Sequence, residues 1–418
     1  MKFICGAAAV AYLGLGGVAL NACGSDARPA PTPMEGTALP NGGRGSGDGG
    51  AGAGQATSAG ANVGGNGVVG GAGVAPSGGQ AASAGAGGGG AGGTGGSVTG
   101  GAPPTEEATF IPDPSWTCGR PGGIVAPVRG RLVLSAELRL GEAHDVGATP
   151  FGKRRVQDVT GGSFEGDNLK GTVLTGGLEL ELELSNGSAE LEQLHVLRTD
   201  DGTLIYLRSC GVAPVAEQTV RIVPRFEVSK TSGLAWLSDA DLVGTRRIDE
   251  ATGTAKLEIY DVENVAVMDP KVTLRDPAGE PQQRWDCTVA QGSQGATVFT
   301  ETVTLGASLS VGQGNEGSRN IIPITGGKVT GRIQGEVLPG GADYQLVGGS
   351  TQLDARYTLA ASDGELILVR NCGAFGALVP VFEARAAGPY SFLNQGAFLS
   401  SDPGSASGGV SITVYERK

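Results

Sequence analysis

The feature that most constrains this chain is an internal duplication, because a recurring pattern of this length folds as repeated copies of one domain. The segment Arg208-Ser209-Cys210-Gly211 recurs as Arg370-Asn371-Cys372-Gly373. The offset between matching positions falls from 169 residues at the start of the repeat to 155 at its end, as loops of unequal length would cause. Other matches in the same order are Trp116 with Trp285, Thr160-Gly161-Gly162 with Thr325-Gly326-Gly327, Phe226-Glu227 with Phe382-Glu383, and Tyr260 with Tyr415.

Each copy carries the alternation of β-strands. Residues 178–184 read Leu-Glu-Leu-Glu-Leu-Glu-Leu, the period-two pattern of a half-buried strand. The pair Asn186-Gly187 follows and suits a two-residue type I′ turn, and Gly348-Gly349 takes the same place in the second copy. About seven to nine short strands in roughly 140 residues favour a barrel, whose closure removes exposed sheet edges. The predicted fold class is all-β, with two tandem antiparallel β-barrel domains after a Gly-rich linker.

The N-terminus predicts export and a lipid anchor. After Lys2, an apolar stretch leads to Leu20-Asn21-Ala22-Cys23, which resembles a bacterial lipobox. Cleavage of residues 1–22 would leave Cys23 acylated and the protein held in a lipid bilayer. We expect an exported protein of the bacterial cell envelope, at the outer membrane or cell surface rather than the inner membrane. The alternatives are an ordinary secretory peptide with an incidental Cys, or an uncleaved anchor.

A Gly-rich tract separates this leader from the duplicated part. Residues 41–100 hold 27 of the 76 Gly residues, and the tract has no periodic apolar positions to build a core. The expected organisation is a signal peptide over 1–22, a disordered tether over 23–109, a first barrel over 110–264, a linker over 265–282 and a second barrel over 283–418.

The six cysteines fit an exported protein. Cys5 leaves with the signal peptide and Cys23 takes lipid, so an even number of thiols remains for disulfides. Each copy has one Cys before its first strand and one near its middle, which favours pairing within the copy. The predicted disulfides are Cys118–Cys210 and Cys287–Cys372, and pairing across the two copies is the alternative.

The net charge excludes one class of partner. The chain carries 30 Lys and Arg against 42 Asp and Glu, a formal charge of −12, and it has no basic cluster. Nucleic-acid binding depends on basic side chains that displace counterions from phosphates, so we exclude it. The two His residues and the disulfide-committed cysteines leave no set with zinc-ligand spacing, and no metal or cofactor is expected.

The motifs of both copies are similar to the bacterial and fungal family catalogued as domain of unknown function 3237. The second copy carries Thr325-Gly326-Gly327, Pro339-Gly340-Gly341-Ala342-Asp343-Tyr344 and Asp354-Ala355-Arg356-Tyr357, and the first carries Gly152-Lys153-Arg154-Arg155. The resemblance covers nearly all of 130–263 and 294–418. It implies a single β-barrel of about 150 residues for each copy, and it implies no established reaction.

One cluster of the second copy could carry chemistry. With a two-residue turn at Gly348-Gly349, Val347 lies opposite Ser350 and Asp343 therefore lies opposite Asp354. Paired carboxylates beside an arginine can perform acid–base chemistry, because crowded like charges raise one pKa. The candidate ligand-binding residues are Asp343, Tyr344, Asp354, Arg356, Tyr357, Arg154, Arg155 and His195.

The first copy favours a plainer interpretation of this cluster. There a row of Glu residues faces away from a row of Leu residues, which predicts leucines in the core and acids in solvent. By the same parity Asp343 and Asp354 point outward, and Tyr344, Tyr357 and His195 point inward. The alternative is a barrel with a polar lumen whose leucines pack between domains. The acidic row is Glu179, Glu181, Glu183, Glu190 and Glu192.

The remaining candidates have both an ordinary and a functional interpretation. Arg154 and Arg155 could hold an anionic ligand at a barrel mouth, or pair with Asp158 or Glu165. His195 is interpreted as a core or lumen histidine satisfied by a hydrogen bond, since the predicted pattern puts no carboxylate on its face.

The predicted function is a binding module whose barrels hold a small, largely apolar ligand or a surface partner. The alternatives are an enzyme that acts on a small carbonyl or polyketide-like substrate in the second barrel, and a structural protein of the envelope. The sequence favours a protein without enzymatic activity.

Overall fold

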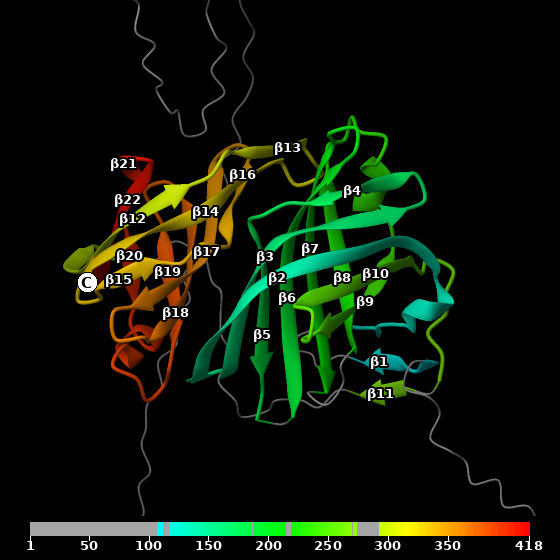
Figure 1. The fold of residues 1–418 in the computed structure, drawn as a ribbon, viewed down its shortest axis with the longest axis horizontal. Helices are drawn as coiled ribbons and strands as arrows, with labels where there is room; N and C mark the ends of the chain where they lie inside the picture. Colours follow the sequence, from blue (N-terminus) through cyan, green and yellow to red (C-terminus); the bar gives the residue numbers. More distant parts are fainter. Residues whose placement is uncertain (1–106, 112–117, 186, 215–218, 270, 274–291) are drawn as a thin grey trace, which may run out of the picture. The chain divides into compact units, whose positions relative to one another are not determined.

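The computed structural model describes residues 107–111, 118–185, 187–214, 219–269, 271–273 and 292–418. All of them lie in one compact unit, Gly93–Lys418. In these ranges the chain forms β-strands and three short 3-10 turns, η2 (Pro127–Arg129), η3 (Ala235–Ser238) and η4 (Ser391–Asn394), and no α-helix. The predicted all-β fold class is confirmed. The strands of the first repeat are coloured cyan to green and those of the second yellow to red (Figure 1).

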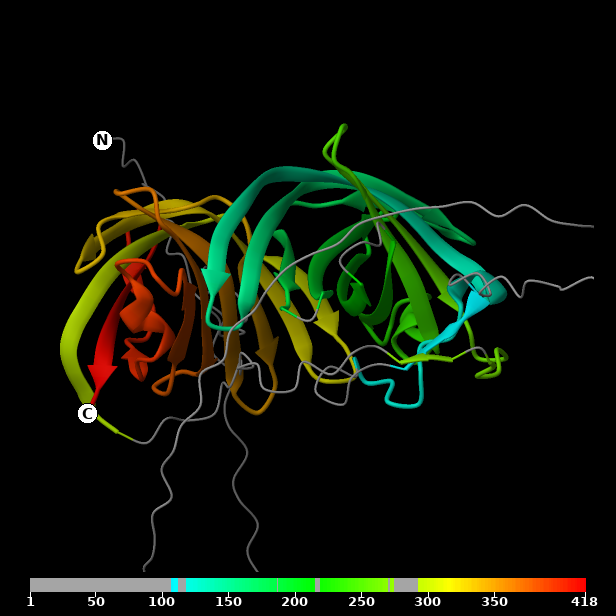
Figure 2. The same ribbon diagram turned by 90° about the horizontal axis from the view of Figure 1, so that it is seen from below.

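The first repeat is a closed antiparallel barrel. Its strands follow the order β2-β10-β9-β8-β7-β6, and the ring closes through β3, which pairs with β2. Between β3 and β6 the gap is bridged by β4 at one end and β5 at the other. In Figure 2 these strands curve round a common interior. The strands are β2 (Arg131–Thr149), β3 (Gly152–Gly166), β4 (Leu169–Val173), β5 (Gly177–Glu183), β6 (Ser188–Thr199), β7 (Leu204–Pro214), β8 (Thr219–Val228), β9 (Leu242–Asp249) and β10 (Thr254–Asp261).

The second repeat follows the same plan. Its sheet runs β19-β18-β17-β15-β14-β12-β22-β20, and β16 bridges β14 and β17 as β5 bridges β3 and β6. The two ends of this row meet where the Ser400 N–H donates to the Leu378 carbonyl oxygen at 3.1 Å. The strands are β12 (Gln294–Leu305), β13 (Leu309–Gln313), β14 (Ser318–Gly331), β15 (Gly335–Val337), β16 (Ala342–Val347), β17 (Thr351–Ala361), β18 (Leu366–Ala374), β19 (Val379–Ala384), β20 (Phe398–Ser400), β21 (Gly404–Ala406) and β22 (Gly409–Arg417).

Each barrel encloses its own apolar core. The core of the first repeat includes Leu134, Phe164 and Ile222, and that of the second includes Phe299 and Phe382. The Phe299 and Phe382 rings meet edge to face with centroids 5.9 Å apart. Burial of this apolar surface is the main term that stabilises both barrels.

The duplicated Thr-Gly-Gly motif has a structural reason. Its last glycine, Gly162 in β3 and Gly327 in β14, adopts a φ of +151° and +155°. A Cβ at either position would stand 2.1 Å from a backbone carbonyl oxygen of the neighbouring strand, that of Glu137 or Thr302. Only glycine fits both the dihedral angle and the close approach.

The predicted two-residue hairpin turns are wrong, and the error has consequences for the whole strand pair. In β5–β6 Glu183 lies opposite Ala189, and the Leu184 N–H donates to the Ser188 carbonyl oxygen at 2.8 Å. In β16–β17 Val347 lies opposite Thr351 rather than Ser350. One extra loop residue shifts the register by one position, and such a shift moves every side chain of one strand to the other face.

The predicted pairing of Asp343 with Asp354 is therefore incorrect, because Asp343 lies opposite Ala355. The predicted solvent-facing row of glutamates is incorrect for Glu179 and Glu192, which are buried, and correct for Glu183, which is exposed. Leu178, Leu180 and Leu194 do not form the core of the first barrel. They join a buried cluster that includes Ile321, Ala342, Tyr344 and Leu368 of the second repeat. The glutamates between these leucines, beginning with Glu179, face the lumen, as in the alternative with leucines packed between domains.

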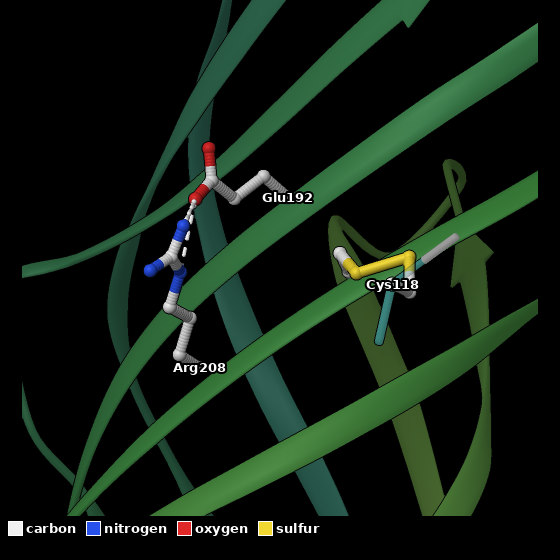
Figure 3. The surroundings of a disulfide bond; sticks show 4 residues. Cys118, Glu192 and Arg208 are labelled. Atoms are coloured by element: carbon white, nitrogen blue, oxygen red, sulfur yellow. Dashed lines mark hydrogen bonds and ion pairs between the residues drawn. A yellow bond between two sulfur atoms is a disulfide. The ribbon is translucent and has the colours of Figure 1, made fainter. Parts of the chain in front are cut away.

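The segment before the first barrel is fastened to it. Strand β1 (Thr109–Ile111) pairs in parallel with β11 (Lys271–Thr273), which lies in the predicted linker. The predicted disulfide Cys118–Cys210 is confirmed, with Cα atoms 5.7 Å apart (Figure 3). Cys372 is also disulfide-bonded. The signal peptide, Cys23, residues 24–106 of the tether and Cys287 lie outside the described residues. Ala108 and Thr109, predicted as the end of the disordered tether, are instead buried, and Thr109 begins β1.

Candidate functional site

A charged and polar cluster occupies the lumen of the first barrel. Glu179 of β5, Gln193 and His195 of β6 and Arg246 of β9 project inward, and each is at most 4% exposed. Arg246 donates from Nε to Glu179 Oε2 at 2.9 Å, with a second bond from Nη2 to the same oxygen. Gln193 Nε2 donates to Glu179 Oε1 at 2.8 Å. Both carboxylate oxygens of Glu179 are therefore held by donors in the barrel interior.

This ion pair keeps Glu179 ionised. Burial alone would raise its pKa, but the charge of Arg246 and the neighbouring His195 outweigh burial and lower the pKa to about 2. A buried carboxylate that keeps its charge needs such partners, because an isolated charge is costly away from water.

The sequence-based interpretation of His195 is wrong in one respect. His195 does point into the barrel as predicted, but a carboxylate shares its face, since Nε2 lies 3.6 Å from Glu179 Oε1. That separation is beyond hydrogen-bonding distance. Neither ring nitrogen of His195 has a hydrogen-bond partner among the described residues, and the same holds for Gln193 Oε1 and Ser209 Oγ.

A cavity of about 1180 Å³ adjoins this cluster. Inside the barrel it is lined by Arg155, Glu181, Leu191, Arg246 and Ile248. Its lining continues over the β9–β10 loop onto the outer faces of β2, β3, β4 and β10, so the cavity joins the barrel end to the surface. The outer lining includes Ser135, Glu137, Ser163, Glu165, Lys170 and Lys256.

Arg154 and Arg155, predicted as an anion site, separate onto the two faces of β3. Arg155 lines the cavity and its Nη1 lies 3.3 Å from Glu250 Oε1. Arg154 points out of the barrel and donates to both carboxylate oxygens of Glu383 in the second repeat, each at 2.8 Å. Neither arginine pairs with Asp158 or Glu165, the partners suggested from sequence. The fold instead places Glu383 and Glu250, which are distant in sequence, beside them.

The duplication makes the Arg154–Glu383 contact one of two crossed ion pairs between the repeats. Arg319 corresponds to Arg154, and Glu227 corresponds to Glu383. Arg319 donates from Nε and Nη2 to the two oxygens of Glu227 at 2.8 and 2.7 Å. Each repeat thus gives its arginine to the Phe-Glu motif of the other, the reciprocal pattern of a two-fold interface.

Besides Arg154, three more of the predicted candidates lie at the contact between the repeats. Asp354 accepts from Arg356 and from Arg370, and Arg356 Nη1 lies 2.8 Å from Glu192 Oε2 of the first repeat. Glu192 also accepts from Arg208 Nη2 at 2.7 Å, as Figure 3 shows. Burial opposes the charge on Glu192, but Arg356 and Arg208 lower its pKa to about 2.

Tyr344 does not point into its barrel, which corrects the prediction from parity. Its ring stacks on that of Tyr206 with centroids 5.5 Å apart, and its hydroxyl donates to the Gly176 carbonyl oxygen at 2.7 Å. The one-residue change of register explains the reversal. Asp354, Arg356 and Tyr344 therefore serve the contact between the repeats.

Asp343 and Tyr357 lie instead in the lumen of the second barrel. The Tyr357 hydroxyl donates to Glu301 Oε1, and Glu301 is 1% exposed. Asp343 accepts from Gln345 Nε2 at 2.7 Å and from the Asp354 N–H at 3.0 Å. Burial raises the pKa of Glu301 to about 7 and that of Asp343 to about 6. Asp343 thus points into the barrel, contrary to the prediction.

Sequence reasoning missed Gln193, Ser209, Arg246 and Glu301. Alternation in β6 and β7 would have placed Gln193 and Ser209 on the inner face once the register was known. Arg246 and Glu301 each occupy a position where the neighbouring inward residues of the strand are apolar. A charged residue in such an apolar row is a signal that the sequence pattern contains.

Comparison with known proteins supports the duplication. The family described as protein of unknown function (DUF3237) matches residues 129–223 and 294–378, one segment in each repeat. The predicted resemblance to this family in two tandem copies is confirmed. A UPF0311 protein of Bradyrhizobium diazoefficiens is 42% identical over 78 residues, which are 18% of this chain and 51% of that protein. The chain spans about half the length of the curated relatives it matches.

Two solved structures are similar to about a third of this chain. A conserved protein of unknown function from Rhodopseudomonas palustris is 24% identical, with a TM-score of 0.29 over 31% of this chain and 95% of that one. A beta-barrel like protein from Acinetobacter baumannii is 27% identical, with a TM-score of 0.29 over 32% and 94% of the two chains.

Proposed function

We propose that this protein is an exported lipoprotein whose first barrel binds a small amphipathic ligand. The observation that carries the proposal is the cavity of about 1180 Å³ beside the buried Glu179–Arg246 pair. Ligand sites in proteins typically have a volume of about 300–1,000 Å³ and combine apolar walls with a few placed polar groups. Leu191 and Ile248 supply apolar wall, and Arg246 and Glu181 supply charge.

The composition of the lining favours a ligand with polar groups over the largely apolar ligand expected from the sequence. Arg155, Glu181 and Arg246 line the part of the cavity inside the barrel. A wholly apolar molecule would remove these side chains from water without replacing their hydrogen bonds, which opposes binding.

Native mass spectrometry of the purified protein tests ligand binding. We expect an additional mass that survives gentle ionisation and is lost on denaturation. Ala189→Leu places extra side-chain volume in the cavity lining and should reduce the fraction of ligand-bound protein. The same change at Ala296, which is exposed on β12, should leave that fraction unchanged. A bare protein mass, or equal effects of the two variants, would contradict binding in this cavity.

The lipid anchor is supported by the segment Leu20-Asn21-Ala22-Cys23. Among the described residues, no helix is long and apolar enough to cross a membrane. We expect Cys23→Ala to move the protein from the membrane fraction to the soluble fraction, because acyl chains supply the membrane affinity. Cys5→Ala, a change within the leader itself, is the control and should leave fractionation unchanged. Unchanged fractionation of Cys23→Ala would refute the anchor.

A second candidate function is acid–base catalysis in the second barrel. The observation that favours it is Glu301, a buried carboxyl group beside the Tyr357 hydroxyl whose pKa is raised to about 7. A group that titrates near neutral pH suits general acid–base chemistry. Conversion of the co-purified ligand that stops in Glu301→Gln, with the fold intact, would favour this candidate, and unchanged conversion would refute it.

A further inference from the structure

We propose that the first barrel contains a polar chamber behind Arg246, formed by Gln193, His195 and Ser209, that receives a neutral hydroxyl group of the ligand. This inference rests on the proposed function, since it names the chemical class of ligand for the same barrel.

The chamber is built from two paired strands. Gln193 of β6 lies directly opposite Ser209 of β7, and His195 follows two residues later on the same face of β6. Gln193 and His195 are 0% exposed and Ser209 is 1% exposed. These three side chains therefore project into the closed interior, with no contact with bulk water.

Four polar atoms of the chamber have no hydrogen-bond partner among the described residues. They are Gln193 Oε1, Ser209 Oγ and the two ring nitrogens of His195. Buried polar atoms in proteins nearly always have partners, and an unsatisfied one costs the fold its full desolvation penalty. A cluster of four in one lumen thus indicates a place where a bound molecule completes the hydrogen bonds.

The chamber lies next to the cavity along strand β6. Ala189 and Leu191 of β6 line the cavity, and Gln193 and His195 are the next two inward residues of the same strand. Arg246 joins the two regions, since it lines the cavity and also bonds Glu179, which in turn accepts from Gln193. In the proposed binding mode, a ligand in the cavity extends a polar group past Arg246 toward the unpartnered atoms.

The inventory of these atoms selects the chemistry of that group. Gln193 Oε1 accepts only, an imidazole ring offers at least one N–H donor, and the Ser209 hydroxyl both donates and accepts. A carboxylate or phosphate would face the Glu179 carboxylate and the Gln193 oxygen, which repel it. A hydroxyl group donates one hydrogen bond and accepts others without charge, and it fits this set.

Isothermal titration calorimetry with two isomers of equal size tests the proposal on the full chain. 1-Octanol donates and accepts hydrogen bonds, whereas 1-methoxyheptane only accepts them. We expect 1-octanol to bind about tenfold more tightly than the ether, the effect of one or two net hydrogen bonds. Octanoate should bind more weakly than 1-octanol, because its charge faces Glu179.

A matched pair of serine variants locates the effect. Ser209→Ala removes one hydroxyl of the chamber and should weaken 1-octanol binding about fivefold and ether binding by less, because the ether can only accept from this hydroxyl. Ser405→Ala, the same change at an exposed position of β21, should leave both affinities unchanged. Unfolding temperatures of both variants show that the fold is retained.

The outcomes separate this inference from the proposed function. If both isomers bind with equal affinity, or if Ser209→Ala weakens both equally, the cavity binds ligands but the hydroxyl chamber is refuted. If octanoate binds most tightly, the ligand is an anion and the inference is overturned. If none of the three compounds binds, the proposed binding function itself fails and this inference fails with it.

Discussion

The carboxyl group of Glu301 should make the stability of this protein depend on pH near neutrality. Glu301 is 1% exposed in the second barrel, its Oε1 accepts from the Tyr357 hydroxyl, and its Oε2 has no partner among the described residues. Burial raises its pKa from 4.5 to about 7. The folded state therefore binds a proton more tightly than the unfolded chain, and it is the protonated form of Glu301 that favours folding.

The sign and magnitude follow from this shift. The stabilisation is fully present below about pH 4.5 and is lost as pH rises to about 7. The rise of the Glu301 pKa from 4.5 to about 7, at 1.36 kcal/mol for each factor of ten in proton affinity, corresponds to about 3 kcal/mol. Asp343, whose pKa is raised to about 6, acts in the same direction below that pH. Glu179 and Glu192, whose pKa values are lowered to about 2, act in the opposite direction and only below about pH 4.5.

Urea unfolding of the wild type and Glu301→Gln across pH 4.5 to 8 measures the effect. Glutamine keeps an oxygen that accepts from Tyr357 and cannot ionise. We expect the difference in unfolding free energy between Glu301→Gln and the wild type to change in favour of the variant as pH rises. Between pH 4.5 and pH 8 this change should be about 3 kcal/mol. Glu336→Gln, an exposed position of β15, controls for loss of a carboxylate. Parallel pH profiles for the wild type and Glu301→Gln would refute the reasoning.

Three further perturbations test the fold and the contact between the repeats. Arg154→Ala and Glu383→Ala should each cost about 3–5 kcal/mol, because each leaves a buried charge unpaired, and a double-mutant cycle should give a coupling of about 1–3 kcal/mol. A coupling near zero by urea unfolding would contradict the crossed ion pairs. Replacing Cys118 and Cys210 by Ala opens a loop of 92 residues and should lower stability by about 4 kcal/mol relative to the oxidised wild type, measured in the same way, and an unchanged stability would contradict this contribution. Gly327→Ala should cost about 2 kcal/mol or more and lower the unfolding temperature, since the new Cβ would stand 2.1 Å from the Thr302 carbonyl oxygen, and an unchanged temperature would contradict that close approach.

The fold class, the duplication and one disulfide could be predicted because each leaves a local signal. The Leu-Glu alternation of residues 178–184 marks a strand wherever it lies, and repeated motifs such as Thr-Gly-Gly mark equivalent positions in two copies. The pairing Cys118–Cys210 followed from the place of each Cys within its copy, and the structure confirms it.

The direction in which side chains point could not be predicted, because it depends on the loop and not on the strand. Asn186-Gly187 suits a two-residue turn, yet the ladder places Glu183 opposite Ala189 and so shifts the register by one. Alternation also cannot say whether leucines face their own core or another domain. The leucines of β5 pack against the second repeat because Tyr344 and Ile321 offer an apolar surface there. Long-range partners such as Glu179 and Arg246, 67 residues apart, leave no local signal.

The central claim is that the first barrel binds a small ligand in its interior, and methyl NMR of the full chain tests it most directly. With 1-octanol as the probe, we predict saturable chemical-shift changes for Leu191, Val220 and Ile248, whose side chains line the cavity. The methyl groups of Ile412 and Val414, in the core of the second barrel, should keep their shifts. Absence of shifts, or shifts confined to the second barrel, would contradict the account.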